Sequence, residues 1–158
     1  MRRYPTKVME QKAADQEYLH KDFHGALAFA IKYLDEKFGP EATTQYLHQV
    51  ADTCYAILSQ QMKAQGLAAL ENHLTEVFSK EKGRFSIGYD RQVLVLEVQE
   101  CPAIAHLKRT GQLFTDRYCV STVHVNEAIC RNAGFRCSCE YEPGQGRCVQ
   151  KFWKEPAE

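Results

Sequence analysis

The sequence has no long hydrophobic run and no excess of charge of either sign. No window approaches the roughly 18 apolar residues that a membrane-spanning helix needs. The 20 Lys and Arg residues are balanced by 20 Asp and Glu residues, which argues against nucleic acid or an anionic membrane as the main partner. The basic start, Met1-Arg2-Arg3, is not followed by an apolar segment, so no export signal is expected. We therefore expect a cytoplasmic protein that binds neither nucleic acid nor membrane.

Several well-known catalytic motifs are also missing. The sequence contains no Walker motif, GxGxxG, GxSxG or CxxC, so it gives no support for a nucleotide-binding, serine-hydrolase or thioredoxin-type protein. It does contain seven cysteines, which is an odd number. Without an export signal, these are expected to be reduced thiols and not a disulfide framework.

The spacing of apolar residues predicts an α+β fold. Helical periodicity covers three segments of the first half, residues 15–38, 41–64 and 67–80, and the alternation of apolar and polar residues then indicates strands. The strands form two hairpins, the first near 85–98 with a central second strand, and the second at 135–142 and 147–153. Two further helices, 102–110 and 117–133, are inserted between the hairpins. We expect N-terminal amphipathic helices packed with an antiparallel sheet in a single domain, 15–154, after a flexible segment, 1–14.

The second hairpin places its cysteines on one face. Its even loop, 143–146, pairs Tyr141 with Cys148, Cys139 with Gln150, and Cys137 with Phe152. Because side chains alternate along a strand, all of these residues share the inner face. Cys137 and Cys139 are interpreted first as small hydrophobic residues of the core, because free cysteine is among the most buried residue types. Cys148 follows a glycine-rich turn and can border a cavity.

Two other cysteines are predicted at helix starts. Cys101 precedes Pro102, which suits the first helical position, and Asp116 as an N-cap places Cys119 in the first turn of the next helix. Unpaired backbone N–H groups and the helix dipole favour a thiolate at such positions. Cys101 and Cys119 are therefore candidates for a nucleophile or a metal ligand. The alternative is that each sulfur fills a gap in the packing.

Two histidines are candidates for a general base. His24 aligns with Leu27 and Ile31 on the first helix and should be partly buried. His124 follows Cys119 by five residues and can deprotonate a thiol if the helix turns it inward.

The second half of the chain resembles a known family. The runs Cys101-Pro102-Ala103-Ile104, Tyr118-Cys119, Gly134-Phe135 and Gly146-Arg147-Cys148 are similar to those of the L-2-amino-thiazoline-4-carboxylic acid hydrolase-like family, over residues 18–153. The resemblance implies a cytoplasmic bacterial hydrolase that opens a five-membered sulfur–nitrogen ring. The reaction would convert an amino-thiazoline carboxylate to an N-carbamoyl cysteine.

The resemblance also implies roles for residues near Cys119. Arg117 would neutralise the carboxylate of the substrate, and Tyr118 and Thr122 would lie in the substrate site. Some relatives carry an acidic residue at the position of Thr122, which argues against a base or metal ligand at this position in this chain.

A second interpretation is a protein that binds without catalysis. The cysteine-rich half is also similar to vinyl-reductase-type domains, which bind or sense small molecules. Such a module would hold a small ligand, or a divalent metal such as zinc through Cys101, Cys119 and Cys148. The apolar helices allow a homodimer, although no heptad repeat specifies one.

Overall fold

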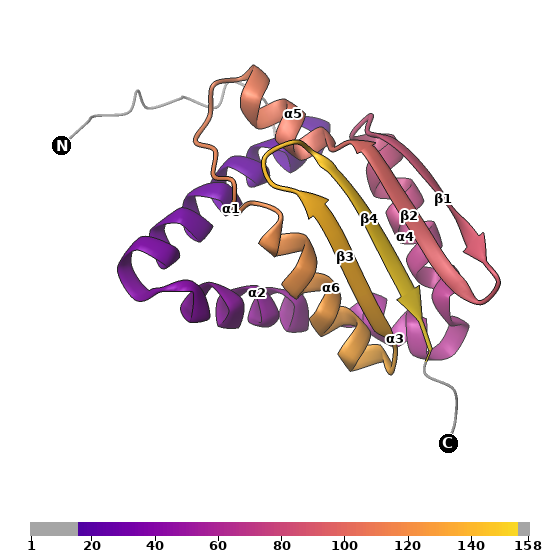
Figure 1. Cartoon of the computed structure of the whole chain (residues 1–158). Coiled ribbons are helices and arrows are strands. Elements are labelled where there is room, and N and C mark those ends of the chain that lie inside the picture. The colour runs from indigo at the N-terminus through magenta and orange to yellow at the C-terminus, as the bar shows by residue number, and fades with distance from the viewer. Residues whose placement is uncertain (1–15, 155–158) are drawn as a thin grey trace.

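The computed structural model describes residues 16–154 (Figure 1). The segment predicted to be flexible, 1–14, lies outside these residues. In chain order the elements are α1 (Gln16–Phe38), α2 (Pro40–Cys54), α3 (Ala56–Gln65), α4 (Leu67–Lys80), β1 (Arg84–Asp90), β2 (Val93–Glu100), α5 (Pro102–Arg109), α6 (Val120–Ala133), β3 (Arg136–Glu142) and β4 (Arg147–Trp153). The predicted α+β class is confirmed.

The four strands form one antiparallel sheet in the order β1-β2-β4-β3. The two hairpins are joined where β2 pairs with β4, so β2 is central, as its apolar sequence predicts. The register of the second hairpin is also as predicted, with Cys139 opposite Gln150 and Cys137 opposite Phe152. Cys148 and Gln150 therefore lie on the same face as Phe152.

The helices cover this inner face. α4 packs against β1 and α6 against β3, while α2 lies on the other side of α6 (Figure 1). Leu94, Leu96 and Phe152 are fully buried beneath the helices. A slip of one residue would expose this whole set to solvent, so its burial fixes the register and keeps Cys148 and Gln150 inside. Among the described helices, none combines the length and the apolar character needed to cross a membrane.

The predicted helix 41–64 is wrong, because the chain breaks it at Tyr55 into α2 and α3. Tyr55 has φ −112° and ψ 16°, outside the helical region. Its side chain packs against the core and makes an edge-to-face contact with His73 at 5.9 Å between ring centroids. The break lets α2 pack on α6 while α3 packs on both α4 and α6.

The start of α6 also differs from the prediction. The helix begins at Val120, three residues later than expected, and Cys119 itself occupies the N-cap position that was predicted for Asp116. The Tyr118 N–H donates to the Thr115 carbonyl in a turn, 2.9 Å between nitrogen and oxygen. This turn carries the Tyr118 side chain into the interior, where it is 5% exposed.

Candidate functional site

Four thiols from four different parts of the fold line one small pocket of about 30 Å³. Cys101 stands between β2 and α5, Cys119 at the start of α6, Cys139 on β3 and Cys148 on β4. The structure thus brings together the three cysteines that the sequence singles out, Cys101, Cys119 and Cys148. We call this space the thiol pocket.

The turn between β3 and β4 holds the thiol pocket together. The Cys101 N–H donates to the Gly146 carbonyl oxygen over 2.8 Å, which ties this turn to the start of α5. Gly146 has φ +72°, a conformation that side chains with a Cβ strain to adopt. A Cβ on Gly146 would lie 3.5 Å from the Cβ of Cys101, which is an ordinary van der Waals contact, so the backbone conformation is the reason for glycine here. Glycine therefore allows the turn that places Cys148 beside Cys101.

Cys148 is surrounded by hydrogen-bond donors. The hydrogen bond from the Cys139 thiol and, to a smaller extent, the bond from Gln150 together lower the pKa of Cys148 to about 7, although burial opposes the shift. Gln150 Nε2 lies 3.3 Å from the sulfur. Asn126 Nδ2 donates to Gln150 Oε1 over 2.8 Å, which turns the amide nitrogen of Gln150 towards Cys148. Cys148 is thus the sulfur of the pocket that most readily becomes a thiolate.

The prediction that helix starts favour a thiolate at Cys101 and Cys119 is wrong. Burial raises the pKa of Cys101 by more than the backbone N–H groups of Ile104 and Ala103 lower it. Burial also raises the pKa of Cys119 to about 12, and the neighbouring Cys101 adds to the effect. Desolvation therefore outweighs the helix ends at both positions.

A larger cavity of about 470 Å³ lies beside the thiol pocket. Phe78, Thr122 and Gln150 border both spaces, so Thr122 lies where a substrate-binding role requires it. Most of the wall comes from apolar side chains of α3, α4 and α6, with a few polar groups among them: His24, His73, Glu81, Ser121 and Asn126. This combination of size and lining is typical of sites for small molecules. We call this space the central cavity.

His24 connects the central cavity to the thiol pocket. His24 Nε2 lies 2.8 Å from Glu81 Oε2, and His24 Nδ1 lies 2.9 Å from the hydroxyl oxygen of Tyr118. A carboxylate only accepts, so Nε2–H donates to Glu81, and in a neutral imidazole Nδ1 accepts from the Tyr118 hydroxyl. Burial raises the pKa of Tyr118 well above its usual value, so Tyr118 remains a phenol. His24 and Glu81 line the central cavity and Tyr118 lines the thiol pocket, so a chain of hydrogen bonds links the two spaces.

Two predicted site residues lie elsewhere. His124 contacts Thr44 and Glu127 and borders neither the thiol pocket nor the central cavity, so the structure does not bring it to a thiol. The cavity side of α6 is formed by Thr122 and by residues one turn further along, and His124 points towards α2. Arg117 Nε donates to Asp35 Oδ2 over 2.6 Å, so its charge is already paired with a carboxylate of the protein.

The thiols do not form a compact set of metal ligands. In residues 16–154, the one group of three potential ligand side chains whose ligand atoms all lie within 4.8 Å of one another is His48, His124 and Glu127. The three sulfurs of Cys101, Cys119 and Cys148 are spread more widely around their pocket. Sequence reasoning did not single out His48 or Glu127, because they lie on different helices.

Glu81 is the other residue that sequence reasoning missed. It follows the last residue of α4 and stands between two lysines, which is typical of a solvated helix end. The structure instead buries its carboxylate, 6% exposed, against His24. Only the fold, which brings Glu81 at the end of α4 next to His24 of α1, reveals this partnership.

Comparisons of the chain with protein-family models, with curated proteins and with solved structures gave no match. The resemblance to the amino-thiazoline carboxylate hydrolases therefore remains a prediction.

Proposed function

We propose that this protein is a thiol-dependent hydrolase that opens a small cyclic substrate at an amidine-like carbon, with Cys148 as the nucleophile. One observation carries the proposal: Cys148 receives hydrogen bonds from Cys139 and Gln150 inside a pocket that adjoins a cavity of small-molecule size. A thiolate held by donors beside a ligand cavity is the arrangement of an activated sulfur nucleophile.

The proposed reaction has two halves. The Cys148 thiolate attacks the ring carbon, a C–S bond forms, and the ring bond to the leaving heteroatom breaks. The leaving heteroatom takes the proton of Tyr118, and Tyr118 recovers a proton from Nδ1 of a protonated His24. Water then attacks the same carbon and gives its proton back to His24 through Tyr118. The C–S bond breaks and the Cys148 thiolate is restored.

Glu81 positions His24 for this transfer. Its carboxylate is buried and lies 2.8 Å from Nε2, so it accepts a hydrogen bond from Nε2–H. It also fixes the ring so that Nδ1 points at Tyr118. His24 and Tyr118 thus act as a pair, with Tyr118 as the group that faces the substrate.

The substrate class follows from the lining of the central cavity. Its walls are mainly apolar, and Arg117, which was expected to bind a carboxylate, is paired with Asp35 outside it. A compact, weakly polar ring therefore fits better than a strongly charged molecule. We propose that the protein meets this substrate in a cytoplasm, where its seven unpaired cysteines stay reduced.

A small-molecule-binding module without catalysis is the second candidate. The thiol pocket, at about 30 Å³, holds little more than a water molecule. A ligand in the central cavity can therefore be bound without reaching Cys148. Such a module would show tight binding and thermal stabilisation by the ligand but no product.

The test is turnover by untagged protein of 2-amino-thiazoline-4-carboxylate and of uncharged cyclic amidines, with products followed by mass spectrometry. We expect Cys148→Ala to reduce turnover by at least about a hundredfold, because the nucleophile is removed. Cys137→Ser is the matched control, because Cys137 borders neither the thiol pocket nor the central cavity and should leave turnover unchanged. Equal turnover by Cys148→Ala and the native chain would overturn the proposal. Ligand binding without product would favour the second candidate.

A further inference from the structure

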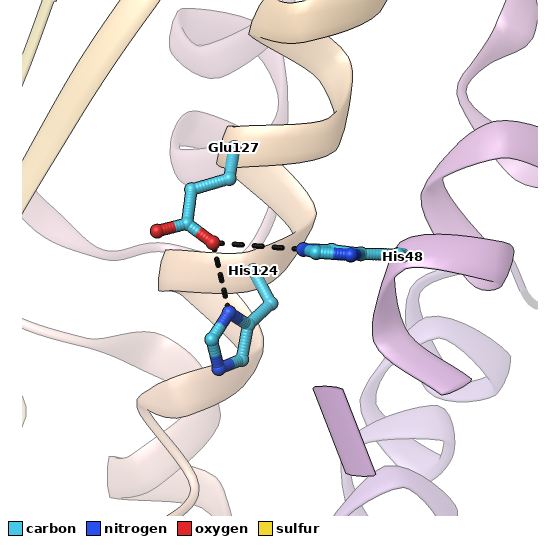
Figure 2. Close-up of side chains that lie close together, drawn as sticks. All are labelled: His48, His124 and Glu127. Atoms are coloured by element: carbon cyan, nitrogen blue, oxygen red, sulfur yellow. Dashed lines mark hydrogen bonds and ion pairs between the residues drawn. The ribbon is translucent and has the colours of Figure 1, made fainter. Parts of the chain in front are cut away.

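We infer that His48, His124 and Glu127 form a binding site for a divalent transition-metal ion of the zinc class, between α2 and α6. The three side chains converge on one point, His48 from α2 and the other two from α6 (Figure 2). His48 is 28% exposed, His124 22% and Glu127 46%, so an ion can reach the site from solvent. The site is separate from the thiol pocket and the central cavity, whose walls contain none of these residues.

His48 supplies an unused ligand atom. Its Nε2 is buried and makes no hydrogen bond, although it lies 3.5 Å from Glu127 Oε2. Buried polar atoms nearly always have a partner, so an unpaired ring nitrogen that faces a carboxylate requires an explanation. A metal ion between the nitrogen and the oxygen would supply one.

Thr44 orients the second imidazole. The Thr44 hydroxyl donates to the Pro40 carbonyl oxygen, so its oxygen is left to accept from Nε2–H of His124 over 3.2 Å. The other ring nitrogen, Nδ1, lies 2.8 Å from Glu127 Oε2. A carboxylate only accepts, so in the absence of a metal Nδ1–H donates to Glu127, and a metal ion would take the place of that hydrogen. Thr44 thus holds the tautomer that a metal ligand needs.

The donor set indicates the class of metal. Two imidazole nitrogens and one carboxylate oxygen suit zinc and its neighbours better than magnesium or calcium, which prefer oxygen ligands throughout. Three protein ligands leave at least one position for water. A bound ion would also join α2 to α6 and should therefore stabilise the fold.

The test is titration of metal-stripped, untagged protein with Zn²⁺ by calorimetry and thermal unfolding. We expect one zinc ion to bind per chain and the Tm of the zinc-bound protein to exceed that of the metal-stripped protein. We expect His48→Gln and Glu127→Gln each to weaken binding at least about tenfold, because each removes a ligand, and Thr44→Val to weaken it about tenfold through His124. His73→Gln is the matched control, because His73 lies on α4 away from the site and should bind zinc as the native chain does.

Cobalt distinguishes this site from the thiols. Co²⁺ bound by thiolate gives an intense near-ultraviolet charge-transfer band, whereas nitrogen and oxygen ligands give only weak visible bands. We expect the weak bands alone at the first equivalent. A thiolate band at the first equivalent, or unchanged affinity in Glu127→Gln, would overturn the inference. Glu127 is partly exposed, so this variant should fold even where His48→Gln does not.

Discussion

At the scale of single residues, the neighbours of a thiol decide whether it ionises. Cys101 and Cys119 are near helix starts, yet burial raises both pKa values. Cys148 is also partly buried, but two donors outweigh the loss of water. The sequence predicts that Cys139, Cys148 and Gln150 share a face, because the hairpin loop fixes their register. It does not predict that Asn126, from α6, turns the Gln150 amide nitrogen to the sulfur.

Removal of the Gln150 amide should make Cys148 less acidic. In Gln150→Leu the thiolate loses a donor, so we expect the pKa of Cys148 to rise and its alkylation at pH 7 to slow by roughly three- to tenfold. Asn126 also loses its partner, which should lower the free energy of unfolding by about 1–3 kcal/mol. Mass spectrometry after timed iodoacetamide treatment measures the first effect and urea denaturation the second. Gln145→Leu, in the exposed part of the turn, should change neither.

Removal of the Tyr118 hydroxyl should separate proton transfer from nucleophilic attack. We expect Tyr118→Phe to reduce turnover of a substrate by about 100-fold or more while Cys148 is alkylated at its native rate. The loss of the hydrogen bond from the Tyr118 hydroxyl to His24 should also cost about 1–3 kcal/mol of stability. Tyr46→Phe, an exposed tyrosine, is the control for both measurements. Native turnover by Tyr118→Phe would remove Tyr118 from the mechanism.

At the scale of elements, the sequence predicted most of the strands and helices because their periodicity is local. The bounds of α4 and the pairing of β3 with β4 agree with the prediction. The break at Tyr55 was missed because apolar spacing continues through it, and tertiary packing alone separates α2 from α3. The late start of α6 was missed for a similar reason, because the burial of Tyr118 overrides the capping signal of Asp116.

The turn at Gly146 offers a test of how elements position the thiols. Gly146→Ala places a Cβ at φ +72° beside Cys101, so we expect a loss of roughly 1–2 kcal/mol of stability. We also expect slower alkylation of Cys148, because relief of the backbone strain shifts the turn next to this thiol. Gly88→Ala is the matched control, because its Cβ would meet nothing within 4 Å and Gly88 has an ordinary strand conformation. The same loss in both variants would contradict the role given to the turn.

At the scale of the whole molecule, the site joins segments that are far apart in the chain. His24 meets Tyr118 across 94 residues and Glu81 across 57. The sequence named His24 and Tyr118 as candidates but could not pair them, because nothing local records which helices pack together. Glu81, His48 and Glu127 were missed for the same reason. The local sequence around each of these three residues gives no sign of its partner.

Acid should weaken the ion pair between Asp35 of α1 and Arg117 in the turn before α6. Burial raises the pKa of Asp35, but the hydrogen bonds from Arg117 and Thr43 outweigh it, so the pKa is lowered overall. Because the pKa of Asp35 is lower in the folded state, the ionised carboxylate stabilises the fold at pH values above the ordinary pKa of aspartate. This contribution is lost as the pH falls from the ordinary pKa through the lowered one. We expect Asp35→Asn to lose up to about 1 kcal/mol at pH 7, because Arg117 is partly exposed.

Urea denaturation of the native chain and of Asp35→Asn at pH 7 and at pH 3 measures this effect. The difference between the two proteins should shrink at pH 3, because this pH lies below the ordinary pKa of aspartate and the unfolded chain then takes up a proton at Asp35. If the two proteins differed by the same free energy of unfolding at pH 7 and at pH 3, the charge of Asp35 would not contribute to stability.

The most direct test of the proposed nucleophile is alkylation of the native, untagged protein with limiting iodoacetamide from pH 5 to pH 10, with each cysteine followed by peptide mass spectrometry. We predict that Cys148 reacts ahead of the other pocket thiols, with a rate that is half-maximal near pH 7, where its pKa lies. Cys101 and Cys119 should stay unreacted at that pH, because burial raises their pKa values. Earlier reaction of Cys101 or Cys119, or a Cys148 that becomes reactive only above pH 9, would contradict the assignment of Cys148 as the nucleophile.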